Sequence, residues 1–211
     1  MRRAILEAVA SDRELIQIVD AAMAEAARLS GAWLVCRPGC AECCIGPFPI
    51  TALDAWRLRQ GMVQLERRDP AAAARVRQRA REAVARLPDY PGDLTTGILD
   101  EDEDAEERFA ALPDEGYCPA LDPDSLTCDV YDSRPVTCRI FGPAVRSADG
   151  DVLGVCELNY QGATDEQIAA CQVVVDPGGM EDSLLEGRKE QTIVAFALLD
   201  QPPACNLQSG R

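Results

Sequence analysis

Cysteine is the residue type with the clearest chemistry in this sequence, and four cysteines fall between residues 36 and 44. Their spacing is Cys-x₃-Cys-x₂-Cys-Cys, and the Pro38-Gly39 pair inside it favours a tight turn. Such a turn lets two or three sulfurs reach one metal ion. Adjacent cysteine side chains usually point in different directions, so we expect Cys43 and Cys44 to bind different metals or different edges of one cluster.

A second block of cysteines follows in CPALDPDSLTCDVYDSRPVTCR, and one more cysteine lies beyond it. Thiolates that lie close together repel one another unless a cation compensates their charge, so clustered cysteines are hard to explain without metal. The competing interpretation is a set of buried or disulfide-bonded thiols. We predict metal ligands at Cys36, Cys40, Cys43, Cys44, Cys118, Cys128, Cys138 and Cys156.

Composition limits what this site can be. The sequence has ten cysteines and no histidine, which excludes Cys₂His₂ zinc, Rieske centres and Cys-His nucleophile pairs. No stretch is apolar enough for an export signal or a membrane span, so we expect a cytoplasmic protein whose thiols stay reduced. The formal charge of -15 disfavours nucleic acid and anionic membranes as partners. The expected partner is a metal ion or cluster.

The elements that must position the cysteines are mostly predicted helices. An apolar content of 47% with only 5% aromatic residues favours a mainly α fold, in one domain over residues 1–211 with a metal-binding core at 36–156. Irregular cysteine-rich loops and at most a few short strands complete it. The predicted helices are 11–29 after a Ser11/Glu14 capping box, one after Thr51 and Asp54, 70–87, 103–112, one after Ser133-Arg134-Pro135, one capped by Thr164 and Gln167, and 181–199.

Two further segments have distinct patterns. Residues 89–108 mix Pro and Gly with a dense acidic run, which favours a mobile loop over packed structure. Asp149-Gly150 predicts a turn, and DVLGVCEL after it predicts a strand. Gly61 is expected to weaken the second helix midway, and the arginine-rich face of the third helix is expected to be solvated.

Together, Cys-x₃-Cys-x₂-Cys-Cys, Cys-Pro-x-Leu and Cys-x-Val-Tyr-x-x-Arg-Pro-x-x-Cys-Arg resemble the bacterial cysteine-cluster family of the YkgJ type, a zinc- or iron-chelating domain. The resemblance covers residues 36–156 and implies metal chelation by the eight cysteines named above. A related cluster in flagellin lysine methylases looks like an iron-sulfur site, so the resemblance leaves zinc and iron both open. Cys171 and Cys205 fall outside the shared pattern, and we expect a buried thiol and an incidental thiol there.

Residues near the cysteines have two interpretations each. Arg134, Arg139 and Tyr131 could support a metal centre through hydrogen bonds and shielding, or form ordinary salt bridges to Asp129 or Asp132 and a packed ring. Two carboxylates between Cys118 and Cys128 are better explained by turn formation than by metal ligation; they are Asp122 and Asp124.

These observations leave competing functions. The first is an iron-sulfur protein with redox or protein-modifying chemistry, which the spacing slightly favours; the second is a non-catalytic structural zinc or metal-handling protein. The spacing Cys36-x₃-Cys40-x₂-Cys43 also occurs in radical S-adenosylmethionine enzymes, but the strand-helix repeats of their partial barrel are missing. An interaction module that recruits a basic partner has only the acidic charge to support it. The sequence identifies no catalytic residue.

Overall fold

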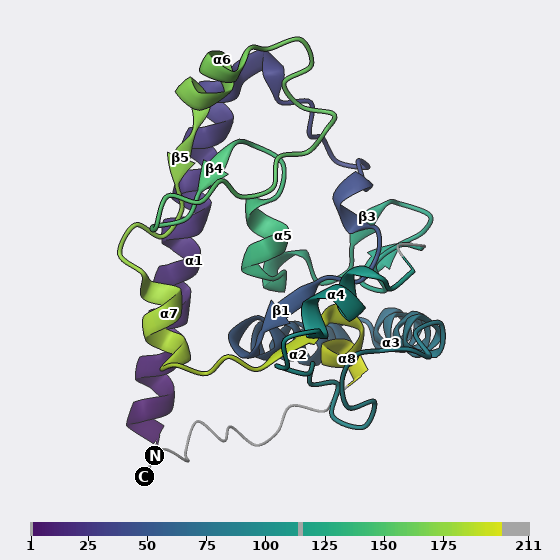
Figure 1. Cartoon of the computed structure of the whole chain (residues 1–211). Coiled ribbons are helices and arrows are strands. Elements are labelled where there is room, and N and C mark those ends of the chain that lie inside the picture. Colours follow the sequence, from purple (N-terminus) through teal and green to yellow (C-terminus); the bar gives the residue numbers. More distant parts are fainter. Residues whose placement is uncertain (1, 114–115, 200–211) are drawn as a thin grey trace. The chain divides into compact units, whose positions relative to one another are not determined.

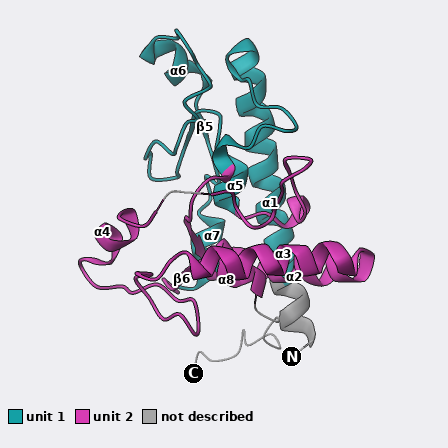
Figure 2. Cartoon of the chain, turned by 90° about the vertical axis from the view of Figure 1, so that its right-hand side faces the viewer, with its two compact units in different colours: residues 1–43, 136–187 teal, residues 44–135, 188–211 magenta. Residues whose placement is uncertain are grey.

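The computed structural model describes residues 2–113 and 116–199, and it is mainly helical (Figure 1). Strands in the described residues are two or three residues long and form two-stranded sheets. This confirms the predicted mainly α fold. The chain forms two compact units (Figure 2), which we call unit 1 (residues 1–43 and 136–187) and unit 2 (residues 44–135 and 188–211). Their assignment to one domain stays a prediction.

Unit 1 is built on the long helix α1 (Arg2–Ser30), whose apolar residues Leu15, Val19 and Ala26 are all fully buried. Their helical spacing places them on one face, which the other elements of the unit cover. These elements are α5 (Val136–Ile140), α6 (Asp165–Cys171), β5 (Val173–Val174) and α7 (Met180–Leu185). The strand β4 (Val145–Arg146) pairs in parallel with β5.

The predicted start of the first helix at Ser11 is wrong, because α1 already begins at Arg2. Residues 2–10 are rich in alanine, leucine, glutamate and arginine, which have high helix propensity, so the helix continues through the candidate cap. The predicted end is confirmed. There the buried hydroxyl of Ser30 donates to the carbonyl of Ala26 at 2.6 Å and lies 2.6 Å from the hydroxyl of Tyr160.

Unit 2 contains two helices that the sequence predicted, one from its cap at Thr51 and one from Pro70 in its first turn. The Thr51 hydroxyl accepts a hydrogen bond from the Asp54 amide at 3.2 Å and begins α2 (Ala52–Arg68). The Asp69 carboxylate accepts one from the Ala72 amide at 2.9 Å and begins α3 (Pro70–Ala85). The remaining elements are β1 (Pro49–Thr51), α4 (Ala105–Ala110), β2 (Leu121–Asp122), β3 (Thr127–Cys128), β6 (Gln191–Ile193) and α8 (Val194–Leu199).

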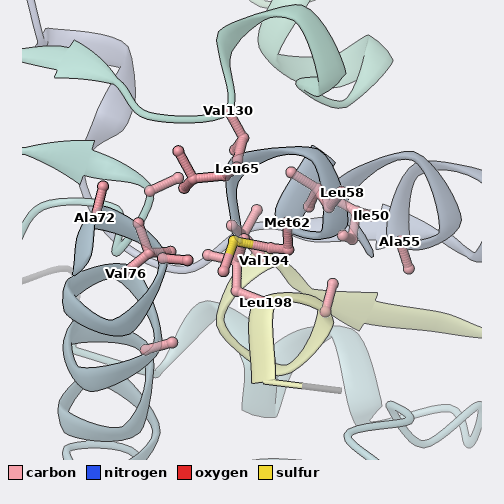
Figure 3. Packing of buried hydrophobic residues seen from close by; sticks show 14 residues of the cluster. Ile50, Ala55, Leu58, Met62, Leu65, Ala72, Val76, Val130, Val194 and Leu198 are labelled. Carbon is pink, nitrogen blue, oxygen red and sulfur yellow. The ribbon is translucent and has the colours of Figure 1, made fainter. Parts of the chain in front are cut away.

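The main core of unit 2 lies between α2, α3 and α8 (Figure 3). Leu58, Met62 and Leu65 of α2 pack there with Val76 of α3, as the predicted apolar faces require. Gly61 does not interrupt α2. A methyl group at Gly61 would instead lie 2.6 Å from the Cβ of Ser133, so the glycine permits close packing of the segment before α5.

The predicted helix over residues 181–199 is wrong, because the structure divides it into α7, β6 and α8. Glu186 and Gly187 have φ values of 53° and 78°, in the left-handed region that ends a helix. Residues Gln191–Ile193 then pair antiparallel with β1. Strand pairing with a distant segment therefore overrides the local helical pattern.

The first half of the acidic segment 89–108 is packed, which corrects the expectation of an unpacked loop there. Tyr90 and Leu99 are buried in a second cluster with Phe196, and the Tyr90 hydroxyl donates to the Gly97 carbonyl at 2.7 Å. The apolar side chains between the acidic residues provide this packing. Mobility of the acidic run itself stays a prediction.

The segment after the Asp149-Gly150 turn has less regular structure than predicted. The turn is confirmed, since the Gly150 amide donates to the Ser147 carbonyl at 3.1 Å. The predicted strand over DVLGVCEL is wrong, because Val152 and Val155 form isolated bridges there. These bridges join Val152 to Arg146 and Val155 to Gly142, so they hold the chain just before Cys156.

Candidate metal centre

The predicted cysteine ligands divide between the two units, and the division falls between the neighbours Cys43 and Cys44. Five of the eight belong to unit 1 and three to unit 2. We call the first set the Cys36 group, with Cys36, Cys40, Cys43, Cys138 and Cys156, and the second set the Cys118 group, with Cys44, Cys118 and Cys128.

In the Cys36 group, three cysteines lie within electrostatic range of Cys36. They are Cys40, Cys43 and the distant Cys156, and their proximity raises the pKa of the Cys36 thiol in addition to the larger effect of burial. The turn at Pro38-Gly39 is confirmed, because the Cys40 amide donates to the Arg37 carbonyl at 3.0 Å. The structure therefore brings Cys156 near the cysteines of residues 36–43.

Asn159 fixes this arrangement, and sequence reasoning missed it. Its side chain is buried; its amide nitrogen donates to the Gly142 carbonyl at 2.8 Å and lies 3.6 Å from the Cys36 sulfur. Its amide oxygen accepts from the Val35 backbone at 3.0 Å, and its own backbone amide donates to the Cys156 carbonyl at 2.9 Å. One residue thus ties Cys36 to Cys156, although no motif in the sequence marked it.

Gly142 leaves room for the Cys36 sulfur. A methyl group at Gly142 would lie 3.2 Å from that sulfur, and the φ of Gly142 is 127°. Both observations explain why a residue without a side chain stands at this position.

Cys138 lies on α5 and is half-buried, beside the buried Arg139. The Arg139 guanidinium contacts both carboxylate oxygens of Asp20 on α1, at 2.8 and 3.1 Å. Arg139 therefore forms a salt bridge as one interpretation expected, but with a partner far from the predicted Asp129 or Asp132. This ion pair anchors the helix that carries Cys138.

In the Cys118 group, backbone pairing joins two distant segments. The Cys118 amide donates to the Cys44 carbonyl at 2.7 Å, and an antiparallel bridge between Ile45 and Tyr117 continues the pairing. The β2–β3 hairpin then places Cys128 opposite Leu121. Charge on Cys128 acts on the Cys118 thiol, so these two side chains are also neighbours.

Burial is the main influence on the pKa of three of these thiols. It raises the pKa of Cys118 to about 12, and it raises the pKa of Cys128 and Cys36 as well. Both Cys118 and Cys128 pack against the core of unit 2. Without a cation these thiols are therefore neutral at physiological pH, and a bound metal ion would have to displace their protons.

Tyr131 and Arg134 contact each other beside the Cys118 group. The Arg134 guanidinium lies 3.8 Å from the centre of the exposed Tyr131 ring, and its positive charge acts on the Cys128 thiol. This geometry fits the supporting role considered for Arg134. The Tyr131 ring is 58% exposed, so a fully packed ring is excluded.

Three other candidates have simpler roles. Asp122 accepts hydrogen bonds from the amides of Asp124 and Ser125, at 3.2 and 2.8 Å, which confirms turn formation. Cys171 is buried in an apolar cluster with Tyr160, and its thiol lies 3.4 Å from the Leu29 carbonyl, which confirms the buried thiol. Cys205 lies outside the described residues.

A cavity of about 270 Å³ opens beside Cys118 within unit 2. Its lining is mainly apolar, and Arg86 is the charged residue among the described lining residues. Phe48, Leu87 and Val194 provide part of the apolar wall. A small molecule could therefore approach the Cys118 group from this side.

The donor chemistry fits zinc or iron, because thiolate is a preferred ligand of both metals. Within residues 2–113 and 116–199, however, no three Cys, Asp or Glu side chains are arranged closely enough to hold a metal ion. The structure therefore brings Cys36 near Cys40, Cys43 and Cys156, and Cys118 near Cys128, without a completed ligand shell among the described residues. Metal binding would have to draw the sulfurs closer together.

Comparison with known proteins identifies the family. The sequence profile of CxxCxxCC, described as a "putative zinc- or iron-chelating domain", matches residues 35–157. No curated protein and no solved structure shows a significant match to the chain. None of the described helices is long and apolar enough to cross a membrane. The match covers more than half of the sequence and includes all eight predicted ligands, so the chain belongs to the CxxCxxCC family of zinc- or iron-chelating domains.

Proposed function

We propose that this protein binds iron or zinc through eight cysteine thiolates, five in the Cys36 group and three in the Cys118 group. The observation that carries the proposal is the proximity of Cys36 to Cys156, which are far apart in sequence and are both contacted by Asn159. Thiolates in such proximity are stable together when a cation compensates their charge. The family assignment supports metal as that cation.

We favour iron, bound as an iron-sulfur cluster. The Cys-x₃-Cys-x₂-Cys run differs from the paired Cys-x₂-Cys knuckles typical of structural zinc. A cluster would give the protein one-electron redox chemistry, which zinc cannot provide. The cavity beside Cys118 would then be the place where a redox partner or a group to be modified approaches.

The competing function is a structural or metal-handling zinc site. The packing of Cys118 and Cys128 against the core of unit 2 favours this alternative, because metal there would stabilise the fold directly. Three thiolates also fall one short of a closed four-coordinate zinc site, so the Cys118 group would need a further ligand.

The decisive experiment is elemental analysis with an absorption spectrum on anaerobically purified protein. Iron with acid-labile sulfide, and a brown colour that bleaches in air, would support the cluster. Stoichiometric zinc in a colourless sample would support the structural alternative. Protein that takes up neither metal, even after incubation with ferrous iron or zinc under reducing conditions, would refute the proposed function.

A further inference from the structure

A single arginine contacts the residues that follow two of the proposed ligands in unit 2. The Nε atom of Arg79 on α3 donates to the carbonyl oxygen of Pro119 at 2.9 Å. Another nitrogen of the same guanidinium donates to the carboxylate of Asp129 at 2.6 Å. Pro119 directly follows Cys118, and Asp129 directly follows Cys128.

We propose that Arg79 is a positioning residue for the Cys118 group, holding Cys118 and Cys128 at a fixed separation. This inference rests on the proposed function in one respect, since the separation matters for chelation only if the two sulfurs bind metal. The guanidinium is planar and rigid, so its two contacts fix both distance and orientation.

The surroundings of Arg79 make this contact effective. Val76 and Ala80, one on each side of it along α3, are fully buried, so the helix is firmly anchored in the core. The side chains of Arg79 and Asp129 are only 21% and 17% exposed, which reduces screening of their ion pair by solvent. A well-shielded ion pair on a fixed helix can restrain a cysteine loop.

The β2–β3 hairpin itself is held by few backbone hydrogen bonds. The Leu121 amide donates to the Cys118 carbonyl at 2.9 Å, and the Asp129 amide donates to the Ala120 carbonyl at 2.8 Å. The strands β2 and β3 are two residues each. A hairpin this short is marginal alone, so a side chain that bridges its two ends contributes substantially to its order.

The other arginines of α3 provide a contrast. Arg77 binds the exposed Glu66 at 2.5 Å, and Arg81 contacts Gln78 at 3.2 Å on the same helix. Neither binds a residue next to a cysteine. The predicted solvated basic face is therefore wrong for Arg79, whose side chain is largely buried and binds Pro119 and Asp129.

The test compares full-length Arg79→Gln and Arg79→Lys with Arg77→Gln as the matched control. Each protein is stripped of metal under reducing conditions and reacted with iodoacetamide over a range of pH. Mass spectrometry then gives the alkylation rate of the thiolate at each cysteine, so that a changed charge near a sulfur does not enter the comparison. We expect Arg79→Gln to raise the rates at Cys118 and Cys128 on the order of tenfold, because the hairpin opens more often. The rate at Cys36 should stay unchanged, and Arg79→Lys should be intermediate.

Equal rates at Cys118 and Cys128 in Arg79→Gln and Arg77→Gln would overturn the inference. If Arg79→Gln does not fold, Asp129→Asn provides the second variant. Because it removes only the contact beside Cys128, it should accelerate alkylation of Cys128 more than that of Cys118. Equal acceleration at the two cysteines, or none, would also overturn the positioning role.

A final measurement separates this inference from the proposed function. Zinc or ferrous iron is added to the stripped proteins before alkylation, and protection of Cys118 and Cys128 is measured. Wild-type protection that weakens in Arg79→Gln but not in Arg77→Gln supports a role of this positioning in metal binding, and equal protection overturns that role. If the wild-type chain binds neither metal, the proposed function fails, while the metal-free rates still decide whether Arg79 positions the two cysteines.

Discussion

The backbone amide of Cys118 donates a hydrogen bond to the carbonyl of Cys44 at 2.7 Å, so one cysteine of the first cluster is joined to the second block of the sequence. Its neighbour Cys43 instead acts electrostatically on the Cys36 thiol. The two adjacent cysteines therefore belong to different surroundings. This agrees with the sequence-based expectation that they serve different metals or different edges of one cluster, which stays a prediction.

If the two neighbours serve different groups, their substitution should have separable effects. We expect Cys43→Ser to expose Cys36 and Cys156 to alkylation in metal-loaded protein, and Cys44→Ser to expose Cys118 and Cys128. Metal content measured on the same samples should fall in both variants. The matched control is Cys171→Ser, which should retain the wild-type metal content because Cys171 is buried in an apolar cluster. Loss of protection at all these cysteines in both variants would show one shared site.

Gly142 gives a prediction with an internal control. Gly142→Ala introduces strain of about 1–2 kcal/mol at a positive φ and also places a methyl group 3.2 Å from the Cys36 sulfur. Gly150→Ala introduces similar strain at a φ of 92° but has no atom within 4 Å of the new methyl group. Both variants should unfold at lower urea concentration. Only Gly142→Ala should release metal faster to a chelator, and equal release rates would show that Gly142 does not shape the site.

Asn159 should stabilise unit 1. If the metal is an iron-sulfur cluster, Asn159 should also affect the midpoint potential of that cluster. Asn159→Leu leaves the Val35 amide and the Gly142 carbonyl without their side-chain partner, which should cost about 1–3 kcal/mol of unfolding free energy in urea. Loss of the amide beside the Cys36 sulfur should also lower the midpoint potential, because N–H groups near sulfur stabilise the reduced cluster.

The control for Asn159 is Gln17→Leu, a substitution at an exposed position of α1 in the same unit. It should change neither the unfolding free energy nor the midpoint potential. An Asn159→Leu variant with wild-type stability would contradict the role assigned to the buried amide. A changed unfolding free energy with an unchanged midpoint potential would show that Asn159 stabilises the fold but does not affect the metal centre.

Gly61 should resist the substitution that usually stabilises a helix. Gly61→Ala gains about 1 kcal/mol of helix propensity, but its methyl group would lie 2.6 Å from the Cβ of Ser133. Overpacking of this kind costs about 1–3 kcal/mol, so we expect a net loss of stability in urea denaturation. The double variant Gly61→Ala with Ser133→Gly removes the clash and should recover most of the loss. A single variant more stable than wild type would show that the segment at Ser133 moves away without cost.

Local signals predicted the parts of the fold that depend on neighbours in sequence. The hydroxyls of Thr51 and Thr164 cap their helices as expected, because a cap needs only residues two or three positions away. The predicted long helix over 181–199 failed for the opposite reason. Its middle pairs with β1, a partner more than a hundred residues away that no local pattern reveals.

The sequence by itself determined the candidate ligand type, the absence of histidine and the family, because these depend on residue identity and spacing alone. The tertiary structure decided which cysteines are neighbours and which side chains support them. Asn159 contacts Cys36 across 123 residues, and Arg79 contacts Pro119 and Asp129 across 40 and 50. Such contacts arise when helices pack and hairpins dock, so residue types and local periodicity cannot specify them.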